Sequence, residues 1–259
     1  MAFMPFITCG DPDMQTTAAV IRTLAESGVD LIELGFPYSD PIADGPVIQA
    51  SYTRALDHHL KVRDIFATVG ELETDSLPPL VAMVAWAIVF RTGPEKFAAE
   101  AARAGFSGLI IPDLPGDEAT EAYQLLQSHG LDLIQLVAPT TTDARTTRIL
   151  NSASGFLYCI SVAGTTGVRD ELPPELRTQL EHLRSQTDLP LAVGFGISQP
   201  AQLDLLRGAA QGAIVGSAIV RMFEQLADGT GNKEQMLAEI GRYAKDMSTA
   251  AHTAAERSA

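Results

Sequence analysis

Eight short apolar runs alternate along the chain with longer segments in which apolar residues recur at helical spacing. The predicted strands are Met4–Thr8, Leu31–Leu34, Leu80–Val84, Gly108–Ile111, Asp132–Leu136, Phe156–Ser161, Leu191–Phe195 and Gly212–Val215. The predicted helices are Thr16–Ser27, Val62–Leu72, Glu95–Ala104, Asp117–His129, Asp143–Ser152, Pro174–Ser185, Pro200–Arg207 and Lys233–Ala255. Strands that alternate with helices form parallel sheets, and eight such units favour a closed (β/α)8 TIM barrel over an open doubly wound sheet.

No linker, low-complexity tract or charge block divides the 259 residues, a length that such barrels commonly reach as one domain. We therefore expect a single domain over residues 1–259, with a frayed tail from about residue 250. Several predicted helices are followed by a glycine that is typical of a helix C-cap. These junctions are Ser27-Gly28, Ala104-Gly105, His129-Gly130 and Gly208-Ala209-Ala210.

The formal net charge is −14, and no cluster of lysine and arginine stands out. We therefore expect neither nucleic acid nor an anionic membrane as a partner. No apolar run approaches the roughly 20 residues that span a bilayer, and the N-terminal residues do not resemble a signal peptide. Cys9 and Cys159 lie in apolar runs without metal-site spacing, which predicts reduced core thiols in a cytoplasmic protein.

The segment Leu31–Gln49 contains two acidic residues in unusual positions. Glu33 stands inside an apolar strand, and Asp44 stands in the loop that follows it. A buried acid is costly unless it has a partner or a chemical role. Active sites of this fold lie at the carboxyl ends of the strands and in the loops beyond them. The two residues are therefore a candidate acid/base pair.

Three glycine-rich segments follow the last three predicted strands: Ala163–Gly167, Gly194–Ser198 and Gly216–Ile219. The loops after the seventh and eighth strands commonly bind phosphate in this fold. Backbone amides and the Ser217 hydroxyl are the expected donors, because the chain has no basic cluster. Ala163–Gly167 is expected to supply another amide and a lid over the ligand.

Several segments of the sequence resemble those of a known family, the tryptophan synthase alpha subunits. The similarity is carried by ELGFPYSDPIADGPVIQ, PFITCGDP, IIPDLP, AGTTGVR, GFGIS and GSAIV, in the family's order over nearly the whole chain. The resemblance implies a lyase of tryptophan biosynthesis that cleaves indole-3-glycerol phosphate to indole and D-glyceraldehyde 3-phosphate by a retro-aldol reaction. It implies no metal or organic cofactor, since pyridoxal phosphate belongs to the beta partner.

The resemblance also implies roles for individual residues. Glu33 matches the general acid/base, and Asp44 matches the carboxylate that holds the indole N–H. Thr166 matches a lid threonine that orders the base. Positions that match phosphate-binding residues are Gly167, Gly196, Gly216 and Ser217. Positions that match the indole pocket are Phe6, Tyr158 and Phe195. Asp40 and the loop Pro37–Gln49 would face a beta subunit, in an α2β2 tetramer.

The sequence departs from the family's pattern in three places. It lacks most of the helix that usually precedes the first strand. Ala85-Trp86-Ala87 stands where the family commonly has a tyrosine and an asparagine, and Val162 stands where some members have arginine. Two other functions stay open. One is a phosphate-sugar isomerase or an indole-releasing lyase that works alone. The other, which the alanines at 85 and 87 suggest, is a catalytically weakened subunit that mainly activates a beta partner.

The candidate site residues also have ordinary structural interpretations. Glu33 is alternatively a buried acid that pairs with an arginine such as Arg54. Asp44 is alternatively a turn residue in Ala-Asp-Gly-Pro. Phe6 and Phe195 are alternatively plain core residues.

For four further polar residues the structural interpretation is the favoured one. Asp40 precedes a proline and is expected to form a turn or cap. Asp113 is expected to link loops. His58 and His59 stand where a helix should end, which favours a surface role near the helix dipole.

Overall fold

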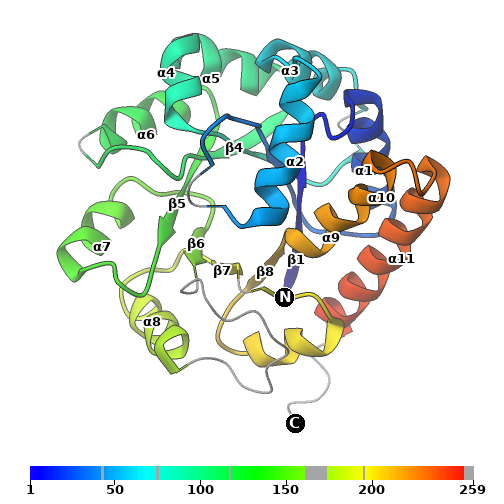
Figure 1. The fold of residues 1–259 in the computed structure, drawn as a ribbon. Helices are drawn as coiled ribbons and strands as arrows, with labels where there is room; N and C mark the ends of the chain where they lie inside the picture. The colour runs from blue at the N-terminus through cyan, green and yellow to red at the C-terminus, as the bar shows by residue number, and fades with distance from the viewer. Residues whose placement is uncertain (42–43, 74–75, 117, 161–173, 195, 254–259) are drawn as a thin grey trace.

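Eight parallel strands form a closed barrel in the computed structural model, which describes residues 1–41, 44–73, 76–116, 118–160, 174–194 and 196–253 (Figure 1). The strands are β1 (Ala2–Thr8), β2 (Ile32–Gly35), β3 (Leu80–Met83), β4 (Phe106–Ile110), β5 (Asp132–Val137), β6 (Leu157–Ile160), β7 (Leu191–Gly194) and β8 (Gly212–Val215). Each pairs with its neighbours in sequence, and β8 pairs with β1, so that Ala2 is opposite Gly212. The predicted (β/α)8 barrel is confirmed.

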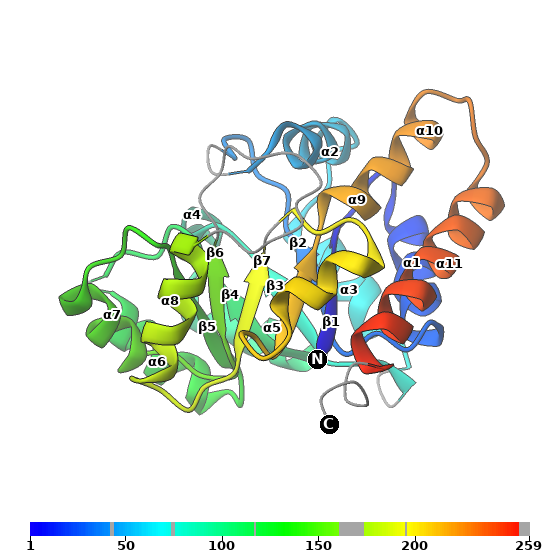
Figure 2. The same cartoon turned by 90° about the horizontal axis from the view of Figure 1, so that it is seen from below.

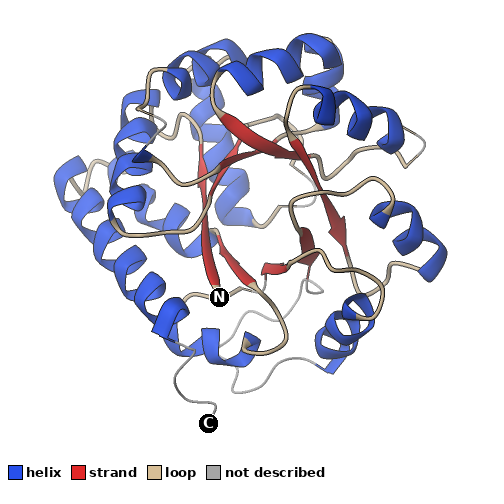
Figure 3. Cartoon of the chain, turned by 180° about the vertical axis from the view of Figure 1, so that it is seen from behind, coloured by secondary structure: helices blue, strands red, loops and turns tan. Residues whose placement is uncertain are grey.

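Helices surround this barrel, as Figure 3 shows from behind. They are α1 (Met14–Glu26), α2 (Pro46–Asp57), α3 (Val62–Gly70), α4 (Trp86–Thr92), α5 (Pro94–Arg103), α6 (Ala119–Ser128), α7 (Asp143–Leu150), α8 (Pro174–Arg184), α9 (Ser217–Val220), α10 (Glu224–Ala227) and α11 (Lys233–His252). Within the described residues, 3-10 helices cover Pro200–Leu206 and Arg221–Phe223.

Five of these elements differ from the predictions. Helices α2, α4 and α10 and the 3-10 helix Arg221–Phe223 were not predicted. Pro200–Leu206 is a 3-10 helix where an α-helix was expected, and it ends before Gly208, whose φ is +74°. The other strands and helices lie where they were predicted, with ends that differ by one or a few residues.

The predicted C-caps are correct, because the glycines at 28, 105, 130 and 208 all have positive φ values between 72° and 91°. At the far end of the chain, α11 stays helical through His252, beyond the point where fraying was expected. His252 contacts Asp30 at 2.8 Å, and Ala251 is buried.

The strands separate two cores. Side chains on their outer faces pack against the helices, and the inward side chains of alternate residues form a second cluster that fills the barrel. The inward cluster comprises Met4, Val81, Ile110, Ile134, Phe156, Ala192 and Ile214. On β2, Ile32 and Leu34 belong to the outer core, so the residue between them, Glu33, points into the barrel.

Both cysteines, Cys9 and Cys159, are buried and unpaired, as predicted. Burial raises the pKa of the Cys159 thiol to about 12, so this thiol stays protonated at neutral pH. Within the described part of the chain, no helix is both long and apolar enough to cross a bilayer.

Candidate active site

Glu33 lies inside the barrel, near the carboxyl end of β2. Its side chain is only 1% exposed, and its backbone pairs with Phe6 on β1 and Val81 on β3. The carboxyl oxygen Oε1 is buried and has no hydrogen-bond partner among the described residues. A buried polar atom of this kind normally has a partner, so its isolation is typical of a functional group that meets a ligand.

The surroundings of Glu33 favour its protonated form. Burial raises the pKa of the Glu33 carboxyl to about 8, and the negative charge of Asp44 adds to that increase. At pH 7 this carboxyl group is therefore protonated, and so neutral, in most molecules. A carboxylic acid with a pKa near the working pH gives and takes a proton with equal ease, which is what a general acid/base requires.

Asp44 lies in the loop between β2 and α2 and has two features. Its backbone is part of a turn, since its N–H donates to the carbonyl of Pro41 at 3.1 Å and its carbonyl accepts from Gln49 Nε2 at 2.7 Å. Burial also raises the pKa of its carboxyl group. The turn interpretation is therefore correct for the backbone, while the carboxyl group is close enough to Glu33 to influence its ionisation.

The alternative that pairs Glu33 with Arg54 is wrong. Arg54 instead binds Asp11 through two contacts, Nη2 to Oδ2 at 2.6 Å and Nε to Oδ1 at 3.0 Å. Ser51 also donates to Oδ2 of Asp11, whose side chain is 1% exposed. This network fixes α2 to the loop after β1, and it leaves Glu33 without a positive partner among the described side chains.

Sequence reasoning did not identify Asp11. The one available signal was its position before Pro12 at the end of an apolar strand.

An apolar group lies above Glu33 and is made of Phe6, Ile48, Tyr52 and Val220. A β-carbon on Gly35 would lie 2.4 Å from Cζ of Phe6, so only glycine at this position allows the phenyl ring its place. Phe6 is therefore packed as core residues are, but at the carboxyl end of the barrel, where a ligand would meet it.

Tyr158 on β6 has a similar relationship to a glycine. A β-carbon on Gly194 would lie 2.7 Å from the Tyr158 hydroxyl. Burial, followed by the charges of Glu33 and Asp44, raises the pKa of the Tyr158 phenol well above its usual value. Tyr158 therefore lies within electrostatic reach of both Glu33 in the barrel and Asp44 in its loop, and it stays neutral.

The carboxyl ends of β7 and β8 carry the glycine segments. Gly216 directly precedes α9, and the first residue of that helix, Ser217, is exposed. Gly196 is also exposed, with a φ of +55°. A β-carbon on Gly216 would lie 3.4 Å from Cδ1 of Phe6, so this glycine borders the same apolar group as Gly35. Three other predicted site residues, Thr166, Gly167 and Phe195, lie outside the described residues.

Four further polar residues, for which a structural role was expected, lie at loops and at a helix end. Oδ1 of Asp113 accepts a 2.7 Å hydrogen bond from the Trp86 N–H, which confirms that Asp113 links two loops. Asp40 is exposed. His58 caps the end of α2, and His59 follows in a left-handed conformation with a φ of 58°. Both histidines are exposed, as a surface role requires.

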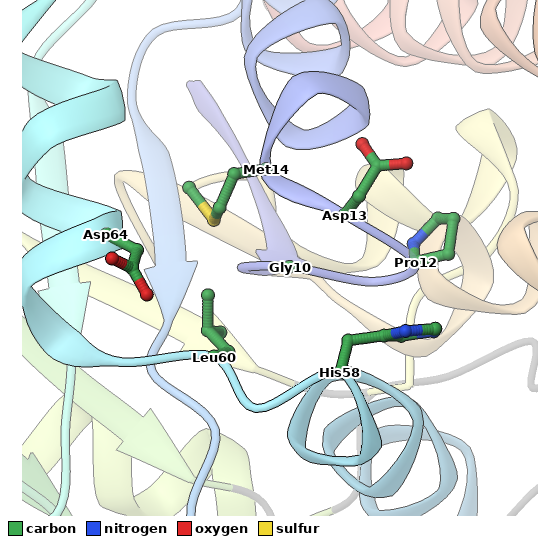
Figure 4. Close-up of a pocket in the computed structure, with 7 residues that line it drawn as sticks. All are labelled: Gly10, Pro12, Asp13, Met14, His58, Leu60 and Asp64. Carbon is green, nitrogen blue, oxygen red and sulfur yellow. The ribbon is translucent and has the colours of Figure 1, made fainter.

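A cavity of about 390 Å³ lies elsewhere, between the start of α1 and the segment that joins α2 to α3 (Figure 4). Its lining residues are Gly10, Pro12, Asp13, Met14, His58, Leu60 and Asp64. Asp13 caps α1 and Asp64 caps α3, so both carboxylates already accept backbone N–H groups. Neither Glu33 nor Asp44 lines this cavity, and we assign it no catalytic role.

The fold and the site together define a class of protein. A parallel (β/α)8 barrel holds a largely neutral carboxylic acid inside, beside a second acid, with glycine-ended strands across the mouth. No group of three or more potential metal-ligating side chains occurs among the residues that the structure describes. This arrangement is typical of a barrel enzyme that works by acid–base chemistry.

Comparisons with known proteins identify the family. The family model for the tryptophan synthase alpha chain matches residues 1–252. The tryptophan synthase alpha chain of Rhodopirellula baltica is 49% identical over 224 residues, which cover 85% of this chain and 80% of that protein. The alpha chain of Methanosarcina mazei is 47% identical over 240 residues, which cover 92% and 87%.

Solved structures agree. The tryptophan synthase alpha subunit of Legionella pneumophila superposes with a TM-score of 0.87 at 35% identity and covers 97% of this chain and 93% of its own. The chain belongs to the tryptophan synthase alpha chain family. It is a carbon–carbon lyase of tryptophan biosynthesis that cleaves indole-3-glycerol phosphate to indole and glyceraldehyde 3-phosphate.

Proposed function

We propose that Glu33 is the general acid/base of this cleavage. The observation that carries the proposal is its buried carboxyl group on β2, with a pKa of about 8 and an oxygen that has no partner among the described residues. In the reaction, C3 of the indole ring gains a proton and the adjoining glycerol hydroxyl loses one. The bond between C3 and the carbon that carries this hydroxyl then breaks, its electron pair returns to the ring, and that carbon becomes the aldehyde carbon. One group that both donates and accepts a proton serves both ends.

We assign Asp44 to the other side of the ring. Protonation at C3 places a positive charge on the indole nitrogen, and a nearby carboxylate that accepts the N–H stabilises that charge. This role is supported by the effect of the Asp44 charge, which raises the pKa values of Glu33, Tyr52 and Tyr158 on three different elements. Asp44 therefore acts on the interior of the barrel from its loop.

The remaining proposed contacts divide by chemistry. Phe6 and Tyr158, together with Phe195, form the walls for the indole ring. Gly196, Gly216 and the Ser217 hydroxyl bind the phosphate, together with Gly167, and Thr166 orders the base from the lid. The position of Gly216 beside Phe6 supports this division, because the phosphate and the ring then lie on neighbouring strands.

We further propose that the chain works as one domain, in the cytoplasm, with a tryptophan synthase beta subunit in an α2β2 complex. The loop Pro37–Gln49, including the exposed Asp40, faces that partner. Pyridoxal phosphate belongs to the beta subunit, and we propose no metal or organic cofactor for the cleavage reaction, which needs no oxidant because protons and electrons balance within the substrate.

Substrate cleavage, measured with and without a purified beta subunit, tests the proposal. Glyceraldehyde 3-phosphate is detected by a coupled dehydrogenase. We expect slow turnover by the chain alone, a strong increase with the partner, and loss of cleavage in Glu33→Gln. Glu26→Gln, a change of the same kind at an exposed position of α1, is the matched control.

The other outcomes distinguish the alternatives. Unchanged turnover in Glu33→Gln rules out the assigned base. Fast turnover that does not respond to the partner identifies a standalone lyase. Activation of the beta subunit without cleavage identifies a weakened subunit, with Ala85 and Ala87 as the first positions to restore.

A further inference from the structure

Helix α2 places a tyrosine over the catalytic strand. Its buried residues are Ile48, Ser51, Tyr52 and Ala55, a helical spacing that faces one side toward the barrel. The helix packs against α9 and β1, and Figures 1 and 2 show it lying across one end of the barrel. Tyr52 is only 1% exposed, so its side chain is directed into the molecule.

The Tyr52 hydroxyl lies directly beyond Glu33. A β-carbon on Gly35 would lie 2.8 Å from this oxygen. Gly35 is two residues after Glu33 on β2, and alternate residues of a strand share a face. The hydroxyl therefore occupies the inward side of β2, one step closer to the mouth of the barrel than the proposed base.

No hydrogen bond joins the Tyr52 hydroxyl to another described residue. The residue as a whole is buried, but its oxygen is not one of the fully enclosed, unpartnered oxygens of the described residues, unlike Oε1 of Glu33. The hydroxyl therefore keeps some access to solvent, where a ligand atom can replace water. The ring is held in place, because its centroid lies 5.7 Å from that of Tyr38 and it packs with Phe6. Burial and the charges of Asp44 and Glu33 raise the phenol pKa well above its usual value, so the group is a neutral donor.

We propose that Tyr52 is a further substrate-contacting residue, whose hydroxyl hydrogen-bonds the glycerol chain of indole-3-glycerol phosphate beside Glu33. The proposal rests on the cleavage function. The indole ring needs apolar walls, and the phosphate needs the amides at the ends of β7 and β8. The remaining polar atoms of the substrate are the glycerol hydroxyls. The glycerol carbons that carry them must lie close to Glu33 for cleavage, and the Tyr52 hydroxyl lies next to Glu33.

Binding measurements with two ligands test this contact. One ligand is the substrate, and the other is an analogue in which a plain three-carbon chain without hydroxyls joins indole to phosphate. Both are titrated by calorimetry into Glu33→Gln, which binds without turnover. We expect Tyr52→Phe in that background to weaken substrate binding about three- to tenfold, the usual worth of one hydrogen bond. Binding of the analogue changes less than twofold.

Tyr243 provides the matched control. Its hydroxyl is buried and unpartnered among the described residues, and it lies on α11 outside the barrel. Tyr243→Phe is expected to leave the ratio of the two affinities unchanged. Equal weakening of both ligands by Tyr52→Phe indicates a purely structural hydroxyl and overturns the proposal, as does no weakening at all.

The same titrations distinguish an error in the assigned substrate from an error in the role of Tyr52. If the Glu33→Gln parent binds neither ligand, the assigned substrate is wrong and the contact falls with it. If the parent binds both ligands, the affinity ratio alone decides the role of Tyr52. Phenylalanine keeps the ring and its contact with Tyr38, so the fold is retained.

Discussion

Asp44 raises the pKa of Glu33, although one residue lies in a loop and the other in the barrel. Burial is the larger cause, so the strand alone makes Glu33 a weak acid and the loop adjusts it. The proton affinity of the proposed base therefore depends on where the loop holds Asp44.

Asp44→Asn is expected to lower the pKa of Glu33 while leaving it above 4.5, since the effect of burial remains. The measurement is an NMR titration of the Glu33 carboxyl carbon in the free protein. An unchanged titration midpoint would show that the two carboxyl groups do not interact. The exposed Asp40→Asn is the control, because Asp40 is not among the causes of the Glu33 shift.

Glu33→Gln is expected to stabilise the fold in a pH-dependent way. The carboxyl pKa is about 8 in the folded protein against 4.5 ordinarily, so between these values the folded chain holds a proton that the unfolded chain has lost. The wild type therefore loses stability as pH rises from 4.5 to 8, by about 1.4 kcal/mol per pH unit at most. The neutral amide of the Glu33→Gln variant carries no such penalty. Urea unfolding at pH 5, 6.5 and 8 should show a growing difference; parallel profiles would contradict it.

Arg54→Leu is expected to destabilise the protein by about 3–5 kcal/mol, because it leaves the buried Asp11 carboxylate without its cation. Arg63 offers the comparison, since its 3.5 Å contact with Asp64 is exposed. Arg63→Leu should cost less than about 1 kcal/mol. Equal unfolding midpoints for the two variants would show that the buried network contributes no more than a surface pair.

Gly35→Ala is expected to disturb the site from within. The new methyl group would overlap Phe6 and the Tyr52 hydroxyl, at a cost of about 1–3 kcal/mol for overpacking. Weaker substrate binding should accompany the loss of stability. Gly116→Ala is the control, because a β-carbon there meets nothing within 4 Å. Wild-type affinity in Gly35→Ala would separate Phe6 from the binding site.

Ser217→Asp is expected to raise the KM for indole-3-glycerol phosphate, because it places a negative charge where the phosphate is proposed to bind. Ser217→Ala should have a smaller effect, since the backbone amides remain. An unaltered KM in the aspartate variant would place the phosphate elsewhere. Steady-state kinetics over a range of ionic strength would show whether repulsion is the cause.

The barrel was predictable because its signal repeats. The outer faces of the strands are apolar and the helices have an apolar side that packs against them. Because this pattern recurs in eight successive units, it predicts a (β/α)8 barrel. Helix α2 escaped prediction because two of its four buried positions are Ser51 and Tyr52, which weaken the apolar period. Its Pro46 at the first turn was the clearest missed sign.

Within the site, residue type indicated the chemistry but not the partners. Glu33 stood out because an acid in an apolar strand is rare. Whether Arg54 neutralised it depended on a contact between segments 43 residues apart, and the structure gives that arginine to Asp11. The position of Tyr52 was equally hidden, because it depends on the space that Gly35 leaves open.

The pairing of β1 with β8 has a consequence for how the enzyme is made. About 210 residues separate Ala2 from Gly212, its partner. A ribosome adding roughly 5–20 residues per second needs about 10–40 seconds to cover that interval. Throughout it, the first strand keeps one edge unpaired and available to other nascent chains. Glu33, the proposed acid, emerges long before the eighth strand, and the wall that encloses it is completed only when that strand leaves the ribosome.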